Sequence, residues 1–255
     1  MSRPAGNRLR NLLEQDRVWC AYALADLEPG YADYSRWLTR ERAVVLVYSG
    51  LTPPVLFAHG DPGAVLQLLS EVPAAEYQYT LLPTHRALLE ERLRPQKEMR
   101  MWRMALRPSD FRSEPDPRAF RLAPEDLPEI EAMFAGQLER PDAFHPRQLE
   151  HGPFYAIREA GTLAAVAGVH VRSLPSRVAA IGNVFTLPKA RGRGLGGAVS
   201  SAVVASLLEE GIETIVLNVA MDNAPALRVY HRMGFMPFCG YFEGVGVLLD
   251  LVREG

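Results

Sequence analysis

A basic, glycine-rich loop between a β-type run and a long apolar helix places the strongest constraint on the fold of this chain. Residues 181–187 read as a strand that stops at Pro188, and the loop follows over residues 189–197. The first amides of a helix lack intrahelical partners and carry partial positive charge, and glycines let an anion approach them closely. The segment therefore predicts a phosphate-binding turn, to which Arg191 and Arg193 add fixed positive charge.

Three kinds of phosphate-binding loop place glycines before a helix, and the neighbouring residues separate them. A P-loop needs Lys-Ser or Lys-Thr after its last glycine, and neither pair is present here. The dinucleotide spacing G-x-G-x-x-G is met by Gly192, Gly194 and Gly197, but too little chain follows, and the preceding segments read as hairpins rather than βαβ units. The third pattern, R-x-x-G-x-G, is met by Arg191, Gly194 and Gly196.

This third pattern, together with the strand sequence NVFTLP before it, resembles the pyrophosphate-binding loop of the GNAT superfamily of acyl-CoA-dependent N-acyltransferases. The resemblance covers about residues 118–252. It implies that the loop amides hold the pyrophosphate of CoA and that the strand before them pairs with the extended pantetheine arm. The CoA-binding residues that it implies are Val184, Phe185, Thr186, Arg191, Gly192, Arg193, Gly194, Leu195, Gly196, Gly197 and Asn223.

The bulk composition fits an ordinary globular chain. Its 255 residues allow one large or two small domains, and a hydrophobic content of 48% supplies enough core. A net charge of −2 favours neither nucleic acid nor an anionic membrane as a partner. Cys20 and Cys239 lie far apart without metal-ligand spacing, so we expect no disulfide and no metal site. Without a signal-peptide core or a membrane-length apolar run, the expected location is cytoplasmic.

The segment 107–118, RPSDFRSEPDPR, separates two halves of the chain and reads as a linker because three prolines and several charges interrupt any regular pattern. In the first half, 1–107, we expect helices at 7–28, 61–70 and 84–93 and strands at 31–38, 43–48, 55–59, 77–82 and 98–106. In the second half, 118–255, we expect strands at 120–122, 154–158, 163–171, 178–187, 214–219, 235–238 and 245–251, and helices at 123–136, from about 146, and at 195–210 and 222–233.

The element order of the second half is that of the GNAT fold, and the first half repeats this order without its first and last strands. We therefore expect an α/β (α+β) protein with two GNAT-like mixed β-sheets flanked by helices, of which the N-terminal copy is degenerate. In that copy the loop position holds HGDPG, residues 59–63, where Asp61 would cap the following helix and repel a phosphate. The N-terminal half is expected to bind no CoA.

Acyl transfer from a thioester to an amine needs a proton donor for the leaving thiolate. In the run VAMDNAPALRVYHRMGF the family pattern of Asn, Tyr and Gly-Phe is matched by Asn223, Tyr230 and Gly234-Phe235. The resemblance makes Tyr230 the general acid. A phenol with a pKa of about 10 can donate its proton to the leaving thiolate, whose thiol has a pKa of about 8.5. The structural alternatives are a helix N-cap for Asn223 and apolar packing for Tyr230.

A group must also accept the proton of the attacking amine, and the sequence offers several. Glu243, in the sequence GYFEG after the last helix, is the first candidate, with His170 and His145 as alternatives. Four residues of the polar stretch 139–152 either shape the acceptor pocket or form a solvated loop: Arg140, Asp142, His145 and Arg147.

The sequence thus favours an N-acyltransferase that moves an acetyl group from acetyl-CoA to a primary amine by direct attack, because no Cys or Ser is placed as an acyl carrier. The alternative is a non-catalytic acyl-CoA-binding or sensor protein that keeps the loop but not the acid and base. The expected partners are acyl-CoA and an amine. The identity of the amine, the length of the acyl group and homodimer formation stay open.

Overall fold

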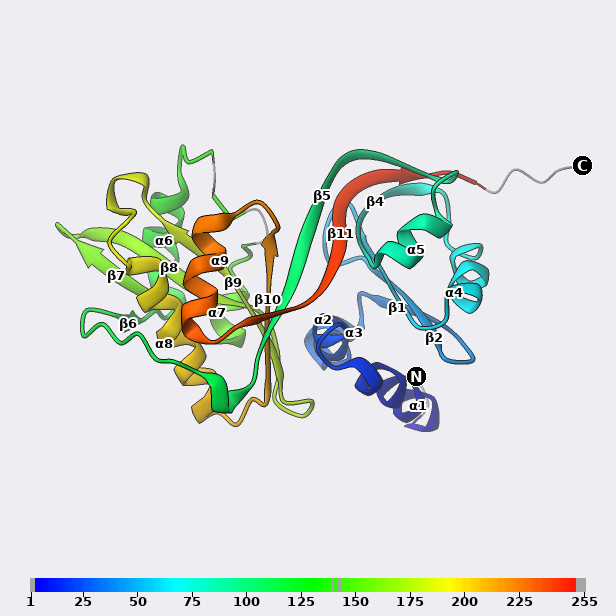
Figure 1. The fold of residues 1–255 in the computed structure, drawn as a ribbon, viewed down its shortest axis with the longest axis horizontal. Helices are drawn as coiled ribbons and strands as arrows, with labels where there is room; N and C mark the ends of the chain where they lie inside the picture. The colour runs from blue at the N-terminus through cyan, green and yellow to red at the C-terminus, as the bar shows by residue number, and fades with distance from the viewer. Residues whose placement is uncertain (1–2, 139, 142–143, 251–255) are drawn as a thin grey trace, which may run out of the picture. The chain divides into compact units, whose positions relative to one another are not determined.

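The computed structural model describes residues 3–138, 140–141 and 144–250, and its chain forms two compact units (Figure 1). Among the described residues, unit 1 comprises 3–103, 220–222 and 238–250, and unit 2 comprises the remainder, from 104 to 219 and from 223 to 237. The C-terminal strand therefore belongs with the N-terminal unit, although a division at residues 107–118 would assign it to the second half.

Unit 1 contains six strands in the order β1-β2-β3-β4-β11-β5, some of whose ends extend beyond the unit. The strands are β1 (Ser35–Arg40), β2 (Ala43–Tyr48), β3 (Val55–His59), β4 (Ala75–Leu81), β5 (Leu93–Leu106) and β11 (Met236–Leu248). Its helices are α1 (Arg3–Leu13), η1 (Glu14–Asp16), α2 (Ala21–Ala25), α3 (Pro29–Ala32), α4 (Pro62–Leu69) and α5 (Pro83–Leu88). The first three strands are antiparallel, β4 runs parallel to β3, and β11 runs antiparallel to β4.

The expectation of two separate C-terminal strands is wrong, because β11 is one continuous strand through the residues expected to lie between them. A Cβ at Gly244 would overlap the carbonyl oxygen of Lys97 and the Tyr79 hydroxyl, and one at Gly246 would lie 2.7 Å from the Arg94 carbonyl oxygen. These glycines therefore allow close backbone approach within the sheet rather than a turn.

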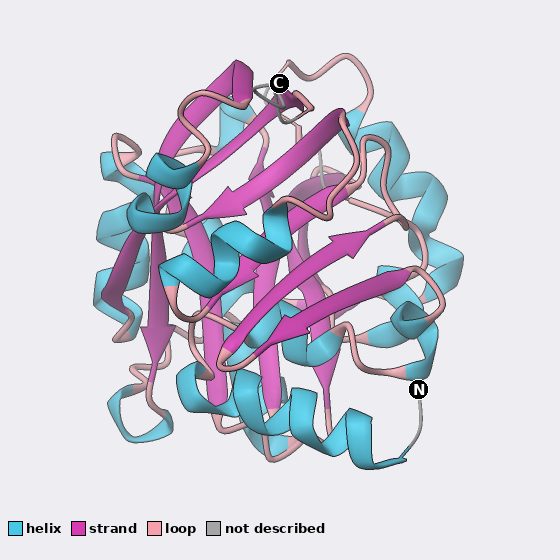
Figure 2. Cartoon of the chain, turned by 90° about the vertical axis from the view of Figure 1, so that its right-hand side faces the viewer, coloured by secondary structure: helices cyan, strands magenta, loops and turns pink. Residues whose placement is uncertain are grey.

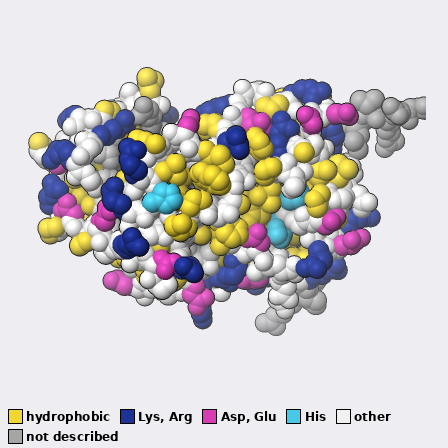
Figure 3. All heavy atoms as spheres, in the orientation of Figure 1, with side chains coloured by type: hydrophobic (Ala, Val, Ile, Leu, Met, Phe, Trp, Pro, Cys, Tyr) yellow, Lys and Arg dark blue, Asp and Glu magenta, His cyan; other side chains and the backbone are white. Residues whose placement is uncertain are grey.

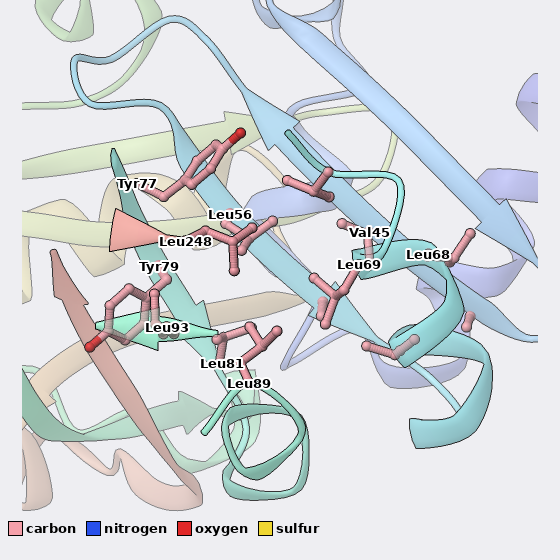
Figure 4. Close-up of a cluster of buried hydrophobic side chains, with 14 of the residues drawn as sticks. Val45, Leu56, Leu68, Leu69, Tyr77, Tyr79, Leu81, Leu89, Leu93 and Leu248 are labelled. Atoms are coloured by element: carbon pink, nitrogen blue, oxygen red, sulfur yellow. The ribbon is translucent and has the colours of Figure 1, made fainter. Parts of the chain in front are cut away.

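The core of unit 1 forms where α4 packs on the strands, and Figure 4 shows these side chains converging. The labelled members are Val45, Leu56, Leu68, Leu69, Tyr77, Tyr79, Leu81, Leu89, Leu93 and Leu248. Full burial of one such side chain stabilises the fold by roughly 1.5–3 kcal/mol relative to exposure. Because Leu248 joins this cluster, the end of β11 is fixed to unit 1 by apolar packing as well as by its pairing with β4.

Unit 2 contains five strands in the order β10-β9-β8-β7-β6. They are β6 (Phe120–Arg121), β7 (Tyr155–Glu159), β8 (Thr162–Ser173), β9 (Val178–Thr186) and β10 (Thr214–Ala220). Its helices are η2 (Pro108–Asp110), η3 (Pro124–Asp126), α6 (Leu127–Phe134), α7 (Gln148–His151), η4 (Pro188–Ala190), α8 (Leu195–Glu209) and α9 (Ala224–Met233). Figure 2 shows the chain coloured by secondary structure, with its helices and strands in different colours.

The two units share one connectivity. In unit 1, the antiparallel strands β1, β2 and β3 are followed by α4, the parallel strand β4 and α5. In unit 2, the antiparallel strands β7, β8 and β9 are followed by α8, the parallel strand β10 and α9. Both units thus have a mixed α/β fold, and the expectation that they are two copies of one architecture stays a prediction.

The segment expected to be a free linker is instead packed within unit 2. The Arg112 amide donates a hydrogen bond to the Met233 carbonyl oxygen at 3.0 Å, and the Glu114 amide donates one to the Ser201 hydroxyl at 2.8 Å. These bonds hold it along α9 and α8. In the described ranges no helix combines the length and apolarity needed to cross a bilayer.

Candidate functional site

The turn before α8 has the backbone geometry that its glycines predict. Gly192 and Gly194 adopt φ values of 77° and 78°, in the left-handed region. An added Cβ at either position would meet no atom within 4 Å, so the conformation rather than the space requires glycine. The left-handed backbone costs a residue with a Cβ roughly 1–2 kcal/mol.

The N-terminus of α8 is open. Gly194 is its N-cap and supplies no side-chain cap. The first amide with an intrahelical acceptor is that of Ala198, which donates to the Gly194 carbonyl oxygen at 3.0 Å. Within the described ranges, the amides of Leu195, Gly196 and Gly197 therefore have no hydrogen-bond acceptor, and the dipole of a helix of 15 residues adds partial positive charge there.

The corresponding helix of unit 1 has a closed N-terminus. Asp61 is the N-cap of α4, and its Oδ1 accepts a hydrogen bond from the Ala64 amide at 3.0 Å, with Pro62 at the first helical position. The predicted cap is thus confirmed. A carboxylate already occupies the place that an anion would take, and its charge repels a second anion.

Two further glycines of the loop serve close packing. A Cβ at Gly196 would lie 3.1 Å from Thr186 Oγ1, and a Cβ at Gly197 would lie 2.6 Å from Glu114 Oε2 and 3.4 Å from Val229 Cγ1. Gly197 therefore lets α8 approach α9 and the segment before β6. Figure 1 shows α8 and α9 side by side.

Both predicted arginines have protein partners in this structure. The Arg193 guanidinium donates two hydrogen bonds to the Glu159 carboxylate, at 2.6 and 2.7 Å, and its side chain is 53% exposed. Arg191 Nε donates to the Thr186 carbonyl oxygen at 3.1 Å. Arginine and lysine side chains are spread over the face of unit 2 shown in Figure 3. A phosphate at the loop would compete with the Glu159 carboxylate for the charge of Arg193.

Strands β9 and β10 separate before the loop. Their parallel pairing runs from Val178 opposite Thr214 to Ile181 opposite Leu217, and no pair follows, although β9 continues to Thr186 and β10 to Ala220. On the other side β9 stays paired to β8 as far as the end of β9.

The predicted residues Val184, Phe185 and Thr186 therefore present a strand edge that has lost its β10 partner. Phe185 itself is buried and its ring meets the edge of Phe134 at 5.6 Å, while Val184 and Thr186 are half-buried. Such an edge can pair with an extended ligand as if with another strand.

The side chains predicted on α9 fill structural roles as well. Asn223 caps α9, because its Oδ1 accepts from the Ala226 amide at 3.1 Å. Tyr230 is 8% exposed and packs edge-on against Phe235 at 6.0 Å. Its hydroxyl has no hydrogen-bond partner in the described ranges. Burial raises the pKa of Tyr230 to about 12, so the hydroxyl keeps its proton at neutral pH.

The three candidate bases lie in different surroundings. Glu243 is on β11 in unit 1, opposite Thr80, and accepts a hydrogen bond from the Tyr241 hydroxyl at 2.9 Å. Burial raises the pKa of Tyr241, and the Glu243 charge adds to this effect. Among the two histidines, both in unit 2, His170 lies on β8 with its ring over Gly182 of β9, where a Cβ would overlap it.

His145, by contrast, belongs to the chain before α7, where its amide donates to Gln148 Oε1 at 3.0 Å and its Nδ1 accepts from the Arg147 amide at 3.2 Å. A cavity of about 510 Å³ lies beside this stretch, lined by Glu131, Phe134, Ala135, Arg140, Pro141, Phe144 and Pro146. Asp142 lies outside the described residues. A second depression, of about 680 Å³, lies at the C-terminal end of α8 and contains none of the predicted site residues.

One residue at the divergence of the strands, Asn183, is not predicted as a site residue by the sequence. Asn183 is a buried side chain that donates a hydrogen bond to Gln148 Oε1 at 2.9 Å. Its φ of 52° marks an irregularity in β9. The signal available in the sequence was a polar residue inside an otherwise apolar strand.

The comparisons with known proteins agree with this geometry. Residues 117–235 match the family model described as Acetyltransferase (GNAT) family. A mycothiol acetyltransferase of Pseudarthrobacter chlorophenolicus is 29% identical over 140 residues, which cover 54% of this chain and 40% of that protein. A streptothricin acetyltransferase of Streptomyces lavendulae is 30% identical over 123 residues, covering 48% of this chain and 64% of that protein. The chain thus matches less than two thirds of the length of either relative.

Solved structures share the fold over nearly the whole chain. A Drosophila protein has a TM-score of 0.71 at 13% identity and covers 98% of both chains. A GNAT-family protein from Novosphingobium aromaticivorans has a TM-score of 0.62 at 24% identity, covering 88% of this chain and 95% of that one. A tandem GNAT protein from the clavulanic acid biosynthesis pathway has a TM-score of 0.53 at 13% identity, covering 94% and 95%.

Proposed function

Because this chain belongs to the GNAT acetyltransferase family through residues 117–235, we propose that it transfers an acetyl group from acetyl-CoA to a primary amine. The relatives named as mycothiol and streptothricin acetyltransferases support acetyl transfer as the reaction class. In this proposal the second half of the chain carries the donor site, and the first half is a degenerate copy of the same architecture.

The observation that carries the proposal is the uncapped N-terminus of α8 at the end of a strand whose edge is free. The amides from Gly192 to Gly197 would bind the pyrophosphate, with Arg191 and Arg193 adding charge. The edge of β9 from Val184 to Thr186 would hold the pantetheine arm in an extended conformation. Asn223, at the start of α9, has its Oδ1 engaged in the cap and would offer Nδ2 to the arm.

The reaction that follows is a direct attack. The amine nitrogen forms a bond to the thioester carbonyl carbon, the C–S bond breaks, and its electron pair leaves on sulfur. The Tyr230 hydroxyl would donate a hydrogen bond to that sulfur. Full proton transfer from a phenol with a pKa of about 12 to a thiolate with a pKa of about 8.5 is uphill by about 5 kcal/mol. Tyr230 would therefore act mainly by stabilising the developing thiolate.

The proton of the attacking amine needs an acceptor, and we keep Glu243 as the proposed base, with His170 and His145 as alternatives. The pH dependence of kcat/KM for the amine separates them, because removing the base removes the acidic limb of the profile. Glu243→Gln should do so if Glu243 is the base. If His170→Gln removes that limb instead, the role passes to His170.

The proposed reaction is tested by CoA release from acetyl-CoA in the presence of 2-phenylethylamine, L-lysine or D-glucosamine. Turnover that saturates with one of these amines, and that yields its N-acetyl product by mass spectrometry, supports the transferase. CoA binding without release in the presence of any amine would favour the alternative, a non-catalytic acyl-CoA sensor.

A further inference from the structure

Asn183 holds an unsatisfied acceptor at the point where β9 and β10 diverge. The side chain is 4% exposed, and its Oδ1 has no hydrogen-bond partner in the described ranges. It lies two residues after Ile181, the last residue of β9 that pairs with β10. Buried polar atoms nearly always have a partner, so an orphaned oxygen at this position calls for an explanation.

The orientation of the Asn183 side-chain amide follows from that of Gln148, which is fixed by hydrogen bonds to two backbone groups. Gln148 Oε1 accepts from the His145 amide at 3.0 Å, and Gln148 Nε2 donates to the His170 carbonyl oxygen at 3.3 Å. A backbone N–H can only donate and a carbonyl can only accept, so Gln148 cannot be flipped. Since its Oε1 must receive a donor, Asn183 presents Nδ2 to it and turns Oδ1 away.

The backbone at Asn183 adds a second observation. Its φ of 52° places a residue other than glycine in the left-handed region, and the pairing of β9 with β8 shifts register beside it. Such conformations concentrate at functional sites, and asparagine tolerates them better than most residues. The backbone irregularity and the Gln148 bond together hold Oδ1 in one place.

We propose that Asn183 Oδ1 accepts a hydrogen bond from the N–H of the acceptor amine and so positions the nitrogen for attack. This inference rests on the proposed function. A neutral primary amine carries two N–H groups and one lone pair, so one hydrogen bond to Oδ1 leaves the lone pair free for the thioester carbon. Asn183 is a positioning residue here, and it takes no proton.

An N–H donor could also come from the pantetheine amides of the donor, but the order of residues along β9 favours the amine. The pyrophosphate site follows the end of β9, so an arm that starts there and runs back along Thr186 to Val184 reaches Asn183 last. Its reacting end, rather than its amide groups, then lies beside Oδ1. The amine that attacks this end would then approach Oδ1.

Kinetics of three variants test the proposal with 2-phenylethylamine, L-lysine and D-glucosamine as acceptors. Asn183→Gly tolerates the left-handed backbone and removes Oδ1, and it should raise the amine KM about tenfold, as expected for one lost hydrogen bond. The affinity for CoA, measured by calorimetry, should change less than about twofold. Asn183→Asp keeps an acceptor oxygen but loses the Nδ2 bond to Gln148, so its amine KM should lie between that of Asn183→Gly and that of the wild type.

The control is Gln148→Leu, which breaks the same side-chain bond but leaves Oδ1 in the protein. A purely structural role for the pair predicts equal defects in Gln148→Leu and Asn183→Gly. The proposal predicts the larger amine KM in Asn183→Gly. Equal defects, or a loss of CoA affinity with an unchanged amine KM, would overturn it.

A binding measurement keeps this inference separate from the catalytic proposal. The side-chain amide signal of Asn183, assigned by its absence from the ¹⁵N spectrum of Asn183→Gly, is followed on adding CoA and then 2-phenylethylamine. A shift on adding the amine supports the proposal. A shift completed by CoA alone assigns Oδ1 to the pantetheine, and no shift in either step removes the role. If no amine is acetylated by the wild type, the proposed function fails while this titration still decides the role of Asn183.

Discussion

The Arg193 guanidinium forms a two-point ion pair with the Glu159 carboxylate, at 2.6 and 2.7 Å, beside the loop proposed to bind pyrophosphate. The Glu159 carboxylate neutralises the Arg193 charge, which would otherwise attract a phosphate. Glu159→Gln should therefore tighten CoA binding. An exposed pair contributes up to about 1 kcal/mol, so the change in Kd should be about two- to fivefold, measured by calorimetry at low salt.

The matched control for this substitution is Glu129→Gln. Glu129 makes a similar pair with Arg158, at 2.8 and 3.0 Å, and Arg158 is no part of the loop. Its CoA affinity should stay at the wild-type value. Weaker CoA binding in Glu159→Gln would show that the pair supports the loop rather than competing with the ligand.

Gly194→Ala should weaken CoA binding, because the left-handed turn orders the amides that face the phosphate. The matched control is Gly211→Ala at the other end of α8, where φ is 80° and an added Cβ also meets nothing within 4 Å. Both variants should lose roughly 1–2 kcal/mol of unfolding free energy. Only Gly194→Ala should also lose CoA affinity, and equal affinity in the two variants would contradict the assigned role of the loop.

Tyr230→Phe should lower kcat while leaving the Kd for CoA within about twofold of the wild type. Burial raises the folded-state pKa of Tyr230 to about 12 from an unfolded value near 10, so the folded state retains the proton longer. The contribution of the protonated Tyr230 hydroxyl to the free energy of unfolding is fully present below pH 10 and is lost as the pH rises from about 10 to 12. The alkaline loss of stability should therefore be smaller in Tyr230→Phe, by about 2–3 kcal/mol at most. Unchanged kcat would remove Tyr230 from the mechanism.

The α8 loop could be predicted because its signals are local. A left-handed glycine, a missing cap and nearby arginines are properties of a few consecutive residues, and the structure places them as expected. The same holds for Asp61, whose cap on α4 follows from its position before Pro62. Local geometry of this kind depends little on the rest of the fold.

Features that depend on distant strands could not be predicted. The β11 segment reads as two separate strands, because nothing local shows that Gly244 and Gly246 lie against the backbone of β5. Asn183 reads as part of an ordinary strand for the same reason, since its burial and its bond to Gln148 require the folded sheet. The prolines of the segment 107–118 likewise predicted a linker, although hydrogen bonds hold this segment to α8 and α9.

The most direct test of the account is a calorimetric titration of the purified chain with CoA, because the central claim is that the open N-terminus of α8 binds the diphosphate. The closed N-terminus of α4, where Asp61 receives the Ala64 amide, excludes a second site in this account. We predict saturable binding with one CoA per chain. The absence of saturable heat would contradict the claim, and two CoA per chain would contradict the assignment of the first half as a copy that binds none.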